Sequence, residues 1–140
     1  IPITTTDRGK KVGLFSQWAV ANVKRFIASE GHCYSEKLWV GGITDCVAEL
    51  NNGQIGIIDF KSAKETYKNM FIQTAGYATQ IEENGILDKD GNLLWKSGKP
   101  FDFYAIVPFG SSEFRVDLQY DLNGYKKGFE SAIQLYRLLN

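Results

Sequence analysis

The stretch from Gly41 to Lys61, GGITDCVAELNNGQIGIIDFK, constrains the fold more than any other part of the chain. It holds two short apolar runs separated by the turn sequence Asn51-Asn52-Gly53. Runs of this length bounded by Asn and Gly are typical of strands joined in a hairpin. We therefore expect one strand over residues 43–50 and a second over about 54–61.

Charged residues interrupt both of these runs. Asp45 lies in the first, and the second ends in Asp59-Phe60-Lys61. Residues two apart in a strand share a face, so Asp59 and Lys61 should point the same way as Ile57. Sheets seldom bury unpaired charge. If Asp45 lies on the same face, two carboxylates and one ammonium meet at one end of the sheet, which suits a hard divalent cation with oxygen ligands.

These residues carry a family resemblance. Asp45 followed by Asp59-x-Lys61 resembles the motif of the PD-(D/E)XK nuclease superfamily. Gln73-x-x-x-Tyr77, which begins twelve residues after the lysine, is similar to the signature of its RecB-type exonuclease branch. Gly-x-x-Asp at residues 42–45 is also in the style of that branch. The resemblance covers roughly residues 36 to 80.

The resemblance implies a metal-dependent DNA exonuclease that hydrolyses phosphodiester bonds. Asp45 and Asp59, with the backbone carbonyl of Phe60, would hold Mg²⁺ or Mn²⁺. Lys61 would position the attacking water or stabilise the transition state. The remaining two residues of the implied catalytic set, which would contact the active site or the substrate backbone, are Gln73 and Tyr77.

Four further residues have two interpretations each. If Gly41-Gly42 is a two-residue hairpin turn, Glu36 is a diagonal neighbour of Asp45 and a candidate metal ligand; the alternative is an exposed strand glutamate. Three residues just after the motif either meet the nucleic-acid backbone or form a solvated helix start: Lys64, Tyr67 and Lys68.

Periodicity along the chain predicts an α/β (α+β) fold with a mixed central sheet flanked by helices. The order α-β-β-β-α-β-β-α agrees with a restriction-endonuclease-like core. We expect one nuclease domain over 1–140, with an extended lead-in at 1–9 and a hairpin or loop insertion at 84–100. The other expected elements are helices at 10–29, 65–83 and 122–139 and strands at 32–40, 101–109 and 113–121.

Composition narrows the class of protein. The 140 residues fit one domain with a single core. A net charge of zero counts against a non-specific DNA coat, although it allows a local basic groove. Two cysteines, Cys33 and Cys46, are too few for the four-cysteine iron–sulfur cluster that some RecB-type nucleases carry. No apolar run is long enough for a membrane span, and an intracellular setting is expected.

The start at Ile1, with Met70 as the only methionine, predicts a processed or excised piece. The expected partner is DNA, single- or double-stranded, with a free end. A phage or DNA repair and recombination system, with a helicase partner, is a fitting context. Alternatives are a restriction-type or junction-cleaving endonuclease of the same fold, a non-cleaving nucleic-acid- or protein-binding module, and an unrelated metal-dependent hydrolase. The sequence leaves oligomeric state open.

Overall fold

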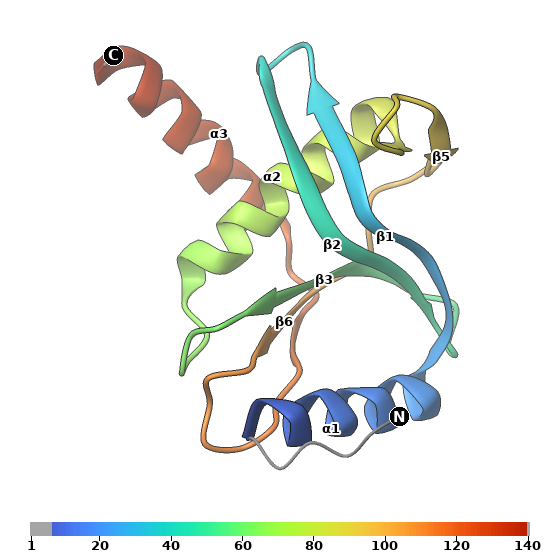
Figure 1. Cartoon of the computed structure of the whole chain (residues 1–140). Coiled ribbons are helices and arrows are strands. Elements are labelled where there is room, and N and C mark those ends of the chain that lie inside the picture. The colour runs from blue at the N-terminus through green and yellow to red at the C-terminus, as the bar shows by residue number, and fades with distance from the viewer. Residues whose placement is uncertain (1–6, 140) are drawn as a thin grey trace.

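The computed structural model describes residues 7–139, which form three helices and seven strands (Figure 1). The observed class is α+β, as the periodicity predicts, and the helix–strand order follows the expected one with the insertion resolved as two short strands. The elements are α1 Asp7–Asn22, β1 Val23–Ser35, β2 Val40–Leu50, β3 Ile55–Lys61, α2 Lys68–Asn84, β4 Ile86–Leu87, β5 Leu93–Trp95, β6 Phe103–Pro108, β7 Asp117–Gln119 and α3 Asn123–Leu139.

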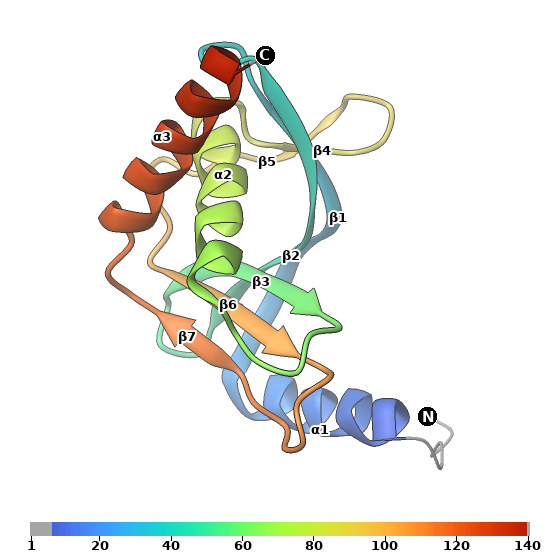
Figure 2. The ribbon, with the colours of Figure 1, turned by 90° about the vertical axis from the view of Figure 1, so that its left-hand side faces the viewer.

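The strands form one mixed sheet in the order β5-β4-β1-β2-β3-β6-β7. β3 and β6 are parallel, and the other neighbouring pairs are antiparallel. The insertion expected within 84–100 contains the β4–β5 hairpin, which joins the sheet where Leu87 pairs with His32 of β1. β1 and β2 form a long hairpin that rises away from β3 and β6 (Figures 1 and 2).

Helices pack against both faces of the sheet. Ile57 and Ile58 are fully buried neighbours in β3 that face opposite layers, as strand alternation requires. Ile57 belongs to a core with Phe71 of α2, and α3 packs beside α2 (Figure 2). Ile58 belongs to a second core, against which Phe15 and Trp18 of α1 pack. No helix within residues 7–139 is long and apolar enough to cross a membrane.

The first helix is shifted toward the N-terminus relative to the expected 10–29. It ends at Asn22, and residues 23–29 belong to β1. The apolar spacing of residues 23–29 also fitted a helix. In the structure their backbone hydrogen-bonding groups pair with β2 instead, beginning where Val23 pairs with Leu50. The prediction of an extended lead-in over 1–9 is wrong for residues 7–9, which are helical; its remainder, residues 1–6, lies outside the described part of the chain.

The first hairpin turn is also displaced from its expected place. The turn covers residues 36–39, Ser35 pairs with Val40, and Gly41 and Gly42 lie inside β2. The prediction of a Gly41-Gly42 turn is therefore wrong, together with the register derived from it. Gly42 serves a packing purpose instead, because a Cβ there would lie 2.8 Å from Cε1 of Tyr77 in α2.

The remaining differences are at element ends. α2 begins at Lys68 rather than residue 65, and the strand expected over 113–121 is confined to Asp117–Gln119. α3 matches its expected range to within one residue at its start. Such boundary shifts are common because end residues exchange hydrogen bonds with turns.

Candidate active site

The candidate site lies where β2 and β3 separate. Their antiparallel pairing runs from Glu49–Ile55 to Cys46–Ile58 and stops there. The next residue on each strand is an aspartate, Asp45 on β2 and Asp59 on β3. Beyond the last pair, the Phe60 N–H donates to Asp45 Oδ2 over 2.8 Å. A side chain thus replaces the backbone ladder at this point, which fixes the Asp45 carboxylate beside the end of β3.

Asp59 and Lys61 share the face of β3 that carries Ile57, as predicted from the two-residue period. Asp59 is only 5% exposed. Lys61 Nζ lies 2.9 Å from Asp59 Oδ2 and donates to Gln73 Oε1 over 2.7 Å. The buried Oδ2 of Asp59 is therefore paired with a cation at close range. Lys61 therefore links the carboxylate of β3 to the amide on α2.

The two carboxyl groups interact strongly. The pKa of Asp59 is raised to about 6, mainly by burial and also by the neighbouring Asp45, while Lys61 opposes the shift. Desolvation penalises a charged carboxylate, and a second carboxylate adds repulsion. The position of Lys61 offsets this only partly, so the pair retains an excess of negative charge that a divalent cation could neutralise.

Tyr77 completes the cluster from α2. It is half-buried one turn after Gln73 and lies against Gly42 of β2. Burial raises the pKa of Tyr77, and the nearby charge of Asp59 adds to the shift, followed by Cys33 and Asp45. Gln73 and Tyr77 also line a common cavity with Gly42 of β2, three residues before Asp45. All five residues of the expected catalytic set thus meet around the divergence of β2 and β3: Asp45, Asp59, Lys61, Gln73 and Tyr77.

Glu36 is not brought to this cluster. It is exposed in the β1–β2 turn, next to the Ser35–Val40 pair. Val40 is five residues from Asp45 along β2, a separation of about 16 Å in a strand. The expectation that Glu36 is a ligand depended on the displaced Gly41-Gly42 turn, and the structure gives Asp45 different neighbours.

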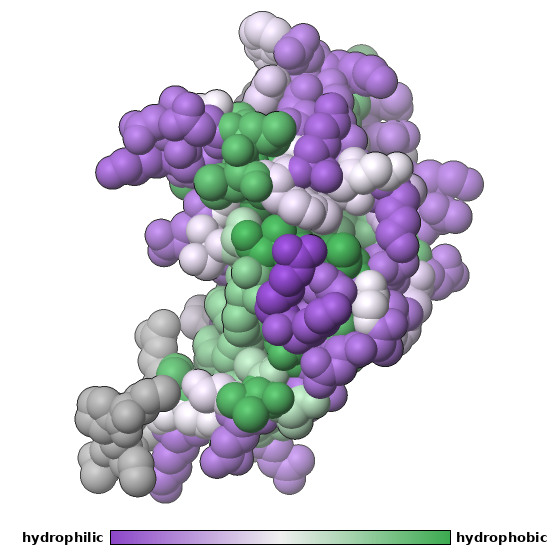
Figure 3. Space-filling model, turned by 90° about the vertical axis from the view of Figure 1, so that its right-hand side faces the viewer, coloured by the Kyte–Doolittle hydropathy of each residue, from purple (hydrophilic) through white to green (hydrophobic). Residues whose placement is uncertain are grey.

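Two residues of β1 approach the site in its place. Asp45 lies between the Ser29–Cys46 and Gly31–Thr44 pairs, so it is level with Glu30. Glu30 and His32 line a cleft of about 610 Å³ together with Asp45. The indentation between the β4–β5 hairpin and α1 is visible at the left of Figure 3. Sequence analysis missed Glu30 because the strand was expected to begin only at residue 32.

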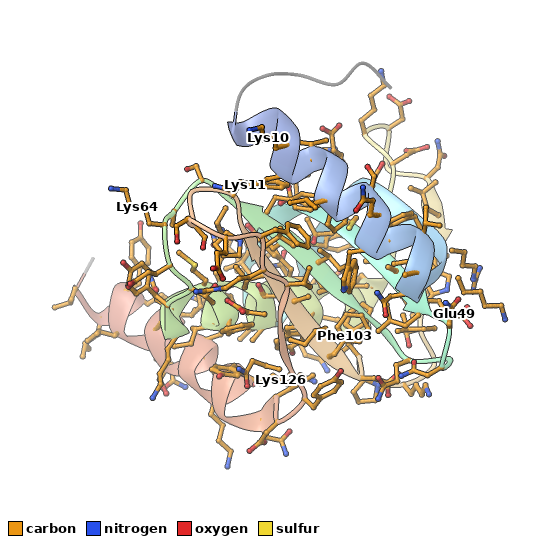
Figure 4. The ribbon with its side chains drawn as sticks, turned by 90° about the horizontal axis from the view of Figure 1, so that it is seen from below. Lys10, Lys11, Glu49, Lys64, Phe103 and Lys126 are labelled. Carbon is orange, nitrogen blue, oxygen red and sulfur yellow. The ribbon has the colours of Figure 1, made fainter. Side chains whose placement is uncertain are left out.

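Several lysines lie on α1 and just after β3. Figure 4, seen from below, shows Lys10 and Lys11 on α1 and Lys64 after β3 toward one corner of the view. Lys11 donates to the carbonyls of Phe109 and Ser111, so its ammonium is engaged within the protein. Lys64 is exposed and points away from the body of the protein. The other two residues proposed for nucleic-acid contact, Tyr67 and Lys68, are also exposed, at the start of α2.

Among residues 7–139, no group of three or more His, Cys, Asp or Glu side chains is arranged as a metal site. Carboxylates at the divergence are limited to a pair, which is a sparse but workable set for magnesium, since this ion commonly binds one or two carboxylates plus waters and substrate phosphates. No family model matches the chain, and no curated protein matches it significantly.

Proposed function

We propose that the chain is a metal-dependent deoxyribonuclease with a restriction-endonuclease-like core, related to the RecB-type branch of the PD-(D/E)XK nucleases. The observation that carries this proposal is the link from Asp59 through Lys61 to Gln73, beside Asp45. These groups follow a motif order that resembles the family. They lie together in the structure although they are spread over 29 residues of the chain.

The residues at the site fit a divalent cation. Asp59 is buried beside Asp45, and the single ammonium of Lys61 is paired with Asp59 at 2.9 Å, so two carboxylates share one cation at this point. Asp45, Asp59 and the Phe60 carbonyl would hold Mg²⁺ or Mn²⁺, with waters completing the shell. When bound, such an ion supplies a polarised water and neutralises charge on phosphoryl oxygens.

Lys61 has the second chemical task. Its ammonium is held between the Asp59 carboxylate and the Gln73 amide, at 2.9 and 2.7 Å. Both partners present an oxygen atom to the ammonium. A fixed ammonium next to the carboxylates can orient an attacking water or stabilise negative charge that develops on the phosphoryl oxygens. Lys61 is therefore assigned electrostatic stabilisation and positioning rather than general-base catalysis.

Exonuclease activity is preferred over endonuclease activity because Gln73 and Tyr77 stand in the RecB-type spacing and both face the same cluster. The substrate would approach through the indentation between α1 and the β4–β5 hairpin (Figure 3). Lys64, Tyr67 and Lys68 are exposed near the end of β3 and would contact the backbone of DNA. Phosphate contacts of this kind position a duplex or strand without reading sequence.

The proposal is tested by incubating end-labelled linear DNA and a covalently closed circle with the full chain in Mg²⁺, Mn²⁺ or EDTA. Metal-dependent degradation of the linear DNA alone, abolished by Asp59→Ala but not by Asp121→Ala, is the expected result. Asp121 is an exposed carboxylate outside the site and serves as the matched control. Cutting of the circle would reassign the activity as endonucleolytic. Absence of cleavage under every metal condition would contradict the proposal.

A further inference from the structure

A smaller cavity of about 250 Å³ lies beside the candidate active site. Its walls come from the start of β2, from α2 and from α3, which places it between the β1–β2 hairpin and the two packed helices. The side chains that shape it include Gln73, Tyr77, Gln80, Phe129 and Ile133. Gln73 and Tyr77 belong to both the catalytic cluster and this cavity, so the two sites are continuous.

Two close contacts give the cavity its shape. Gly42 lets the Tyr77 ring lie directly against β2, and Gly76 lets the Phe129 ring of α3 lie directly against α2. A Cβ at either glycine would collide with the aromatic ring facing it. The cavity therefore has aromatic groups on two sides, one from α2 and one from α3.

Two glutamine side chains contribute amide groups to the lining of the cavity. Gln80 is 2% exposed, and its Nε2 donates to the Gly76 carbonyl over 2.9 Å, which leaves the buried Oε1 without a partner. Gln73 uses its Oε1 for Lys61, and its Nε2 donates to no described residue. The polar side chains of the lining are thus two amides and the Tyr77 phenol, beside apolar groups of β2 and α3. An unpaired buried acceptor is costly and calls for a donor.

The cavity also lies close to the two carboxylates along β2. Gly42, which forms its floor against Tyr77, precedes Asp45 by three residues, or about 10 Å of strand. A group bound there would be attached to the substrate close to the bond that the carboxylates address, rather than to a remote part of the DNA.

We propose that this cavity binds the nucleobase of a nucleotide adjacent to the scissile phosphate, an inference that rests on the proposed nuclease function. A base is flat and apolar on its faces, so it can stack on aromatic side chains, and its edge carries donors and acceptors. A base can enter only when it is unstacked from its neighbours. The preferred substrate is therefore a single-stranded end, or a duplex end that frays.

The test uses oligonucleotides that carry 2-aminopurine, a fluorescent base, at the terminal nucleotide or at one of the next three positions. Binding to the full chain in EDTA, and separately in Ca²⁺, should change the fluorescence at one of these positions only. Phe129→Leu, which keeps an apolar side chain packed near Gly76, and Gln80→Leu should each weaken that binding about tenfold, the scale of lost base stacking. Tyr120→Ala, an exposed aromatic away from the cavity, should leave it unchanged.

An equal fluorescence response at all four positions, or binding that both cavity variants leave unchanged, would overturn the inference. An abasic nucleotide at the responsive position gives an independent readout, because wild-type affinity should fall to that of the variants. Binding does not require cleavage, so failure of this inference is distinct from failure of the nuclease proposal. If the protein cleaves DNA but binds the abasic oligonucleotide as tightly as the intact one, the nuclease proposal stands and the proposal of a base-binding cavity is wrong.

Discussion

At the scale of single residues, the site combines groups that are unfavourable in isolation. Asp59 is buried beside a second carboxylate, and the neighbouring Lys61 offsets the resulting rise in the pKa of Asp59 only in part. Natural proteins retain such arrangements at functional sites, where stability is lost in exchange for chemistry. Asp59 is thus expected to weaken the metal-free fold and to become favourable when a cation is bound.

We predict that Asp59→Asn stabilises the protein in EDTA at pH 8 by on the order of 1–3 kcal/mol. Because the pKa of Asp59 is raised to about 6 when folded, above its unfolded value, the folded state binds more protons between these pKa values. Stability of the wild type therefore falls as pH rises from about 4 to about 6 and stays lower above that range. Thermal melts at pH 4 and pH 8 should show the gain only at pH 8.

The matched control is Asp121→Asn, an exposed carboxylate that should change the melting temperature little at either pH. A lower melting temperature for Asp59→Asn at pH 8 would mean that attraction to Lys61 outweighs burial and repulsion from Asp45. Added Mg²⁺ provides a second comparison, since it should stabilise the wild type and not the variant.

The two cysteines lead to a separate residue-scale prediction. Burial raises the pKa of Cys33 and of Cys46 to about 12, so neither forms a thiolate at neutral pH. The folded protein should take up no maleimide label at pH 7, whereas the protein in concentrated urea should take up two. Mass spectrometry counts the labels directly, and rapid labelling of the folded protein would show that one of these strands opens readily.

At the scale of elements, the geometry of the site follows from how β2 leaves β3. The two-residue period of β3 was readable from the sequence, and it correctly placed Asp59 and Lys61 on the face of Ile57. The position of the first hairpin turn was not readable, because Gly41-Gly42 has the composition of a turn but is needed within β2 for the approach of Tyr77. Because the turn was predicted in the wrong place, Glu36 was expected near Asp45, and Glu30 was not recognised as a neighbour of Asp45.

We predict that Gly42→Ala lowers nuclease activity more than it lowers stability. The new Cβ would lie 2.8 Å from Cε1 of Tyr77, and the ring can move away more readily than β2 can. A displaced Tyr77 no longer faces the carboxylates, so a loss of about tenfold or more in kcat is expected, since small misplacements at an active site are costly. Initial rates of DNA degradation and thermal melts separate the two effects.

Gly41→Ala is the neighbouring control, because its Cβ would meet only the Cys33 carbonyl, at an ordinary 3.6 Å. Both substitutions change the same residue type in the same strand, so a shared effect of alanine on β2 cancels. Equal activities for the two variants would indicate that the position of Tyr77 does not matter for turnover.

At the scale of the whole molecule, the sheet order places the site in the middle of a concave side. β3 and β6 end between the β1–β2 hairpin and α1 (Figure 2), and the surface is indented there (Figure 3). Local patterns in the sequence predicted the α+β class, the element order and the residues that gather at the divergence of β2 and β3. They did not predict the cleft beside Glu30 and His32 or the cavity beside Phe129, because these depend on strand register and on how α3 packs against α2, which are long-range properties.

Lys61 and the two aspartates form the proposed metal-dependent hydrolytic site. The most direct measurement is the rate of degradation of end-labelled linear DNA in Mg²⁺ by wild type, Lys61→Met and Lys99→Met. Lys99 is an exposed lysine outside the site, so its variant controls for loss of one positive charge. We predict a loss of about 100-fold or more for Lys61→Met, as for removal of other transition-state stabilisers, with an unchanged melting temperature. Wild-type rates in Lys61→Met would contradict the account.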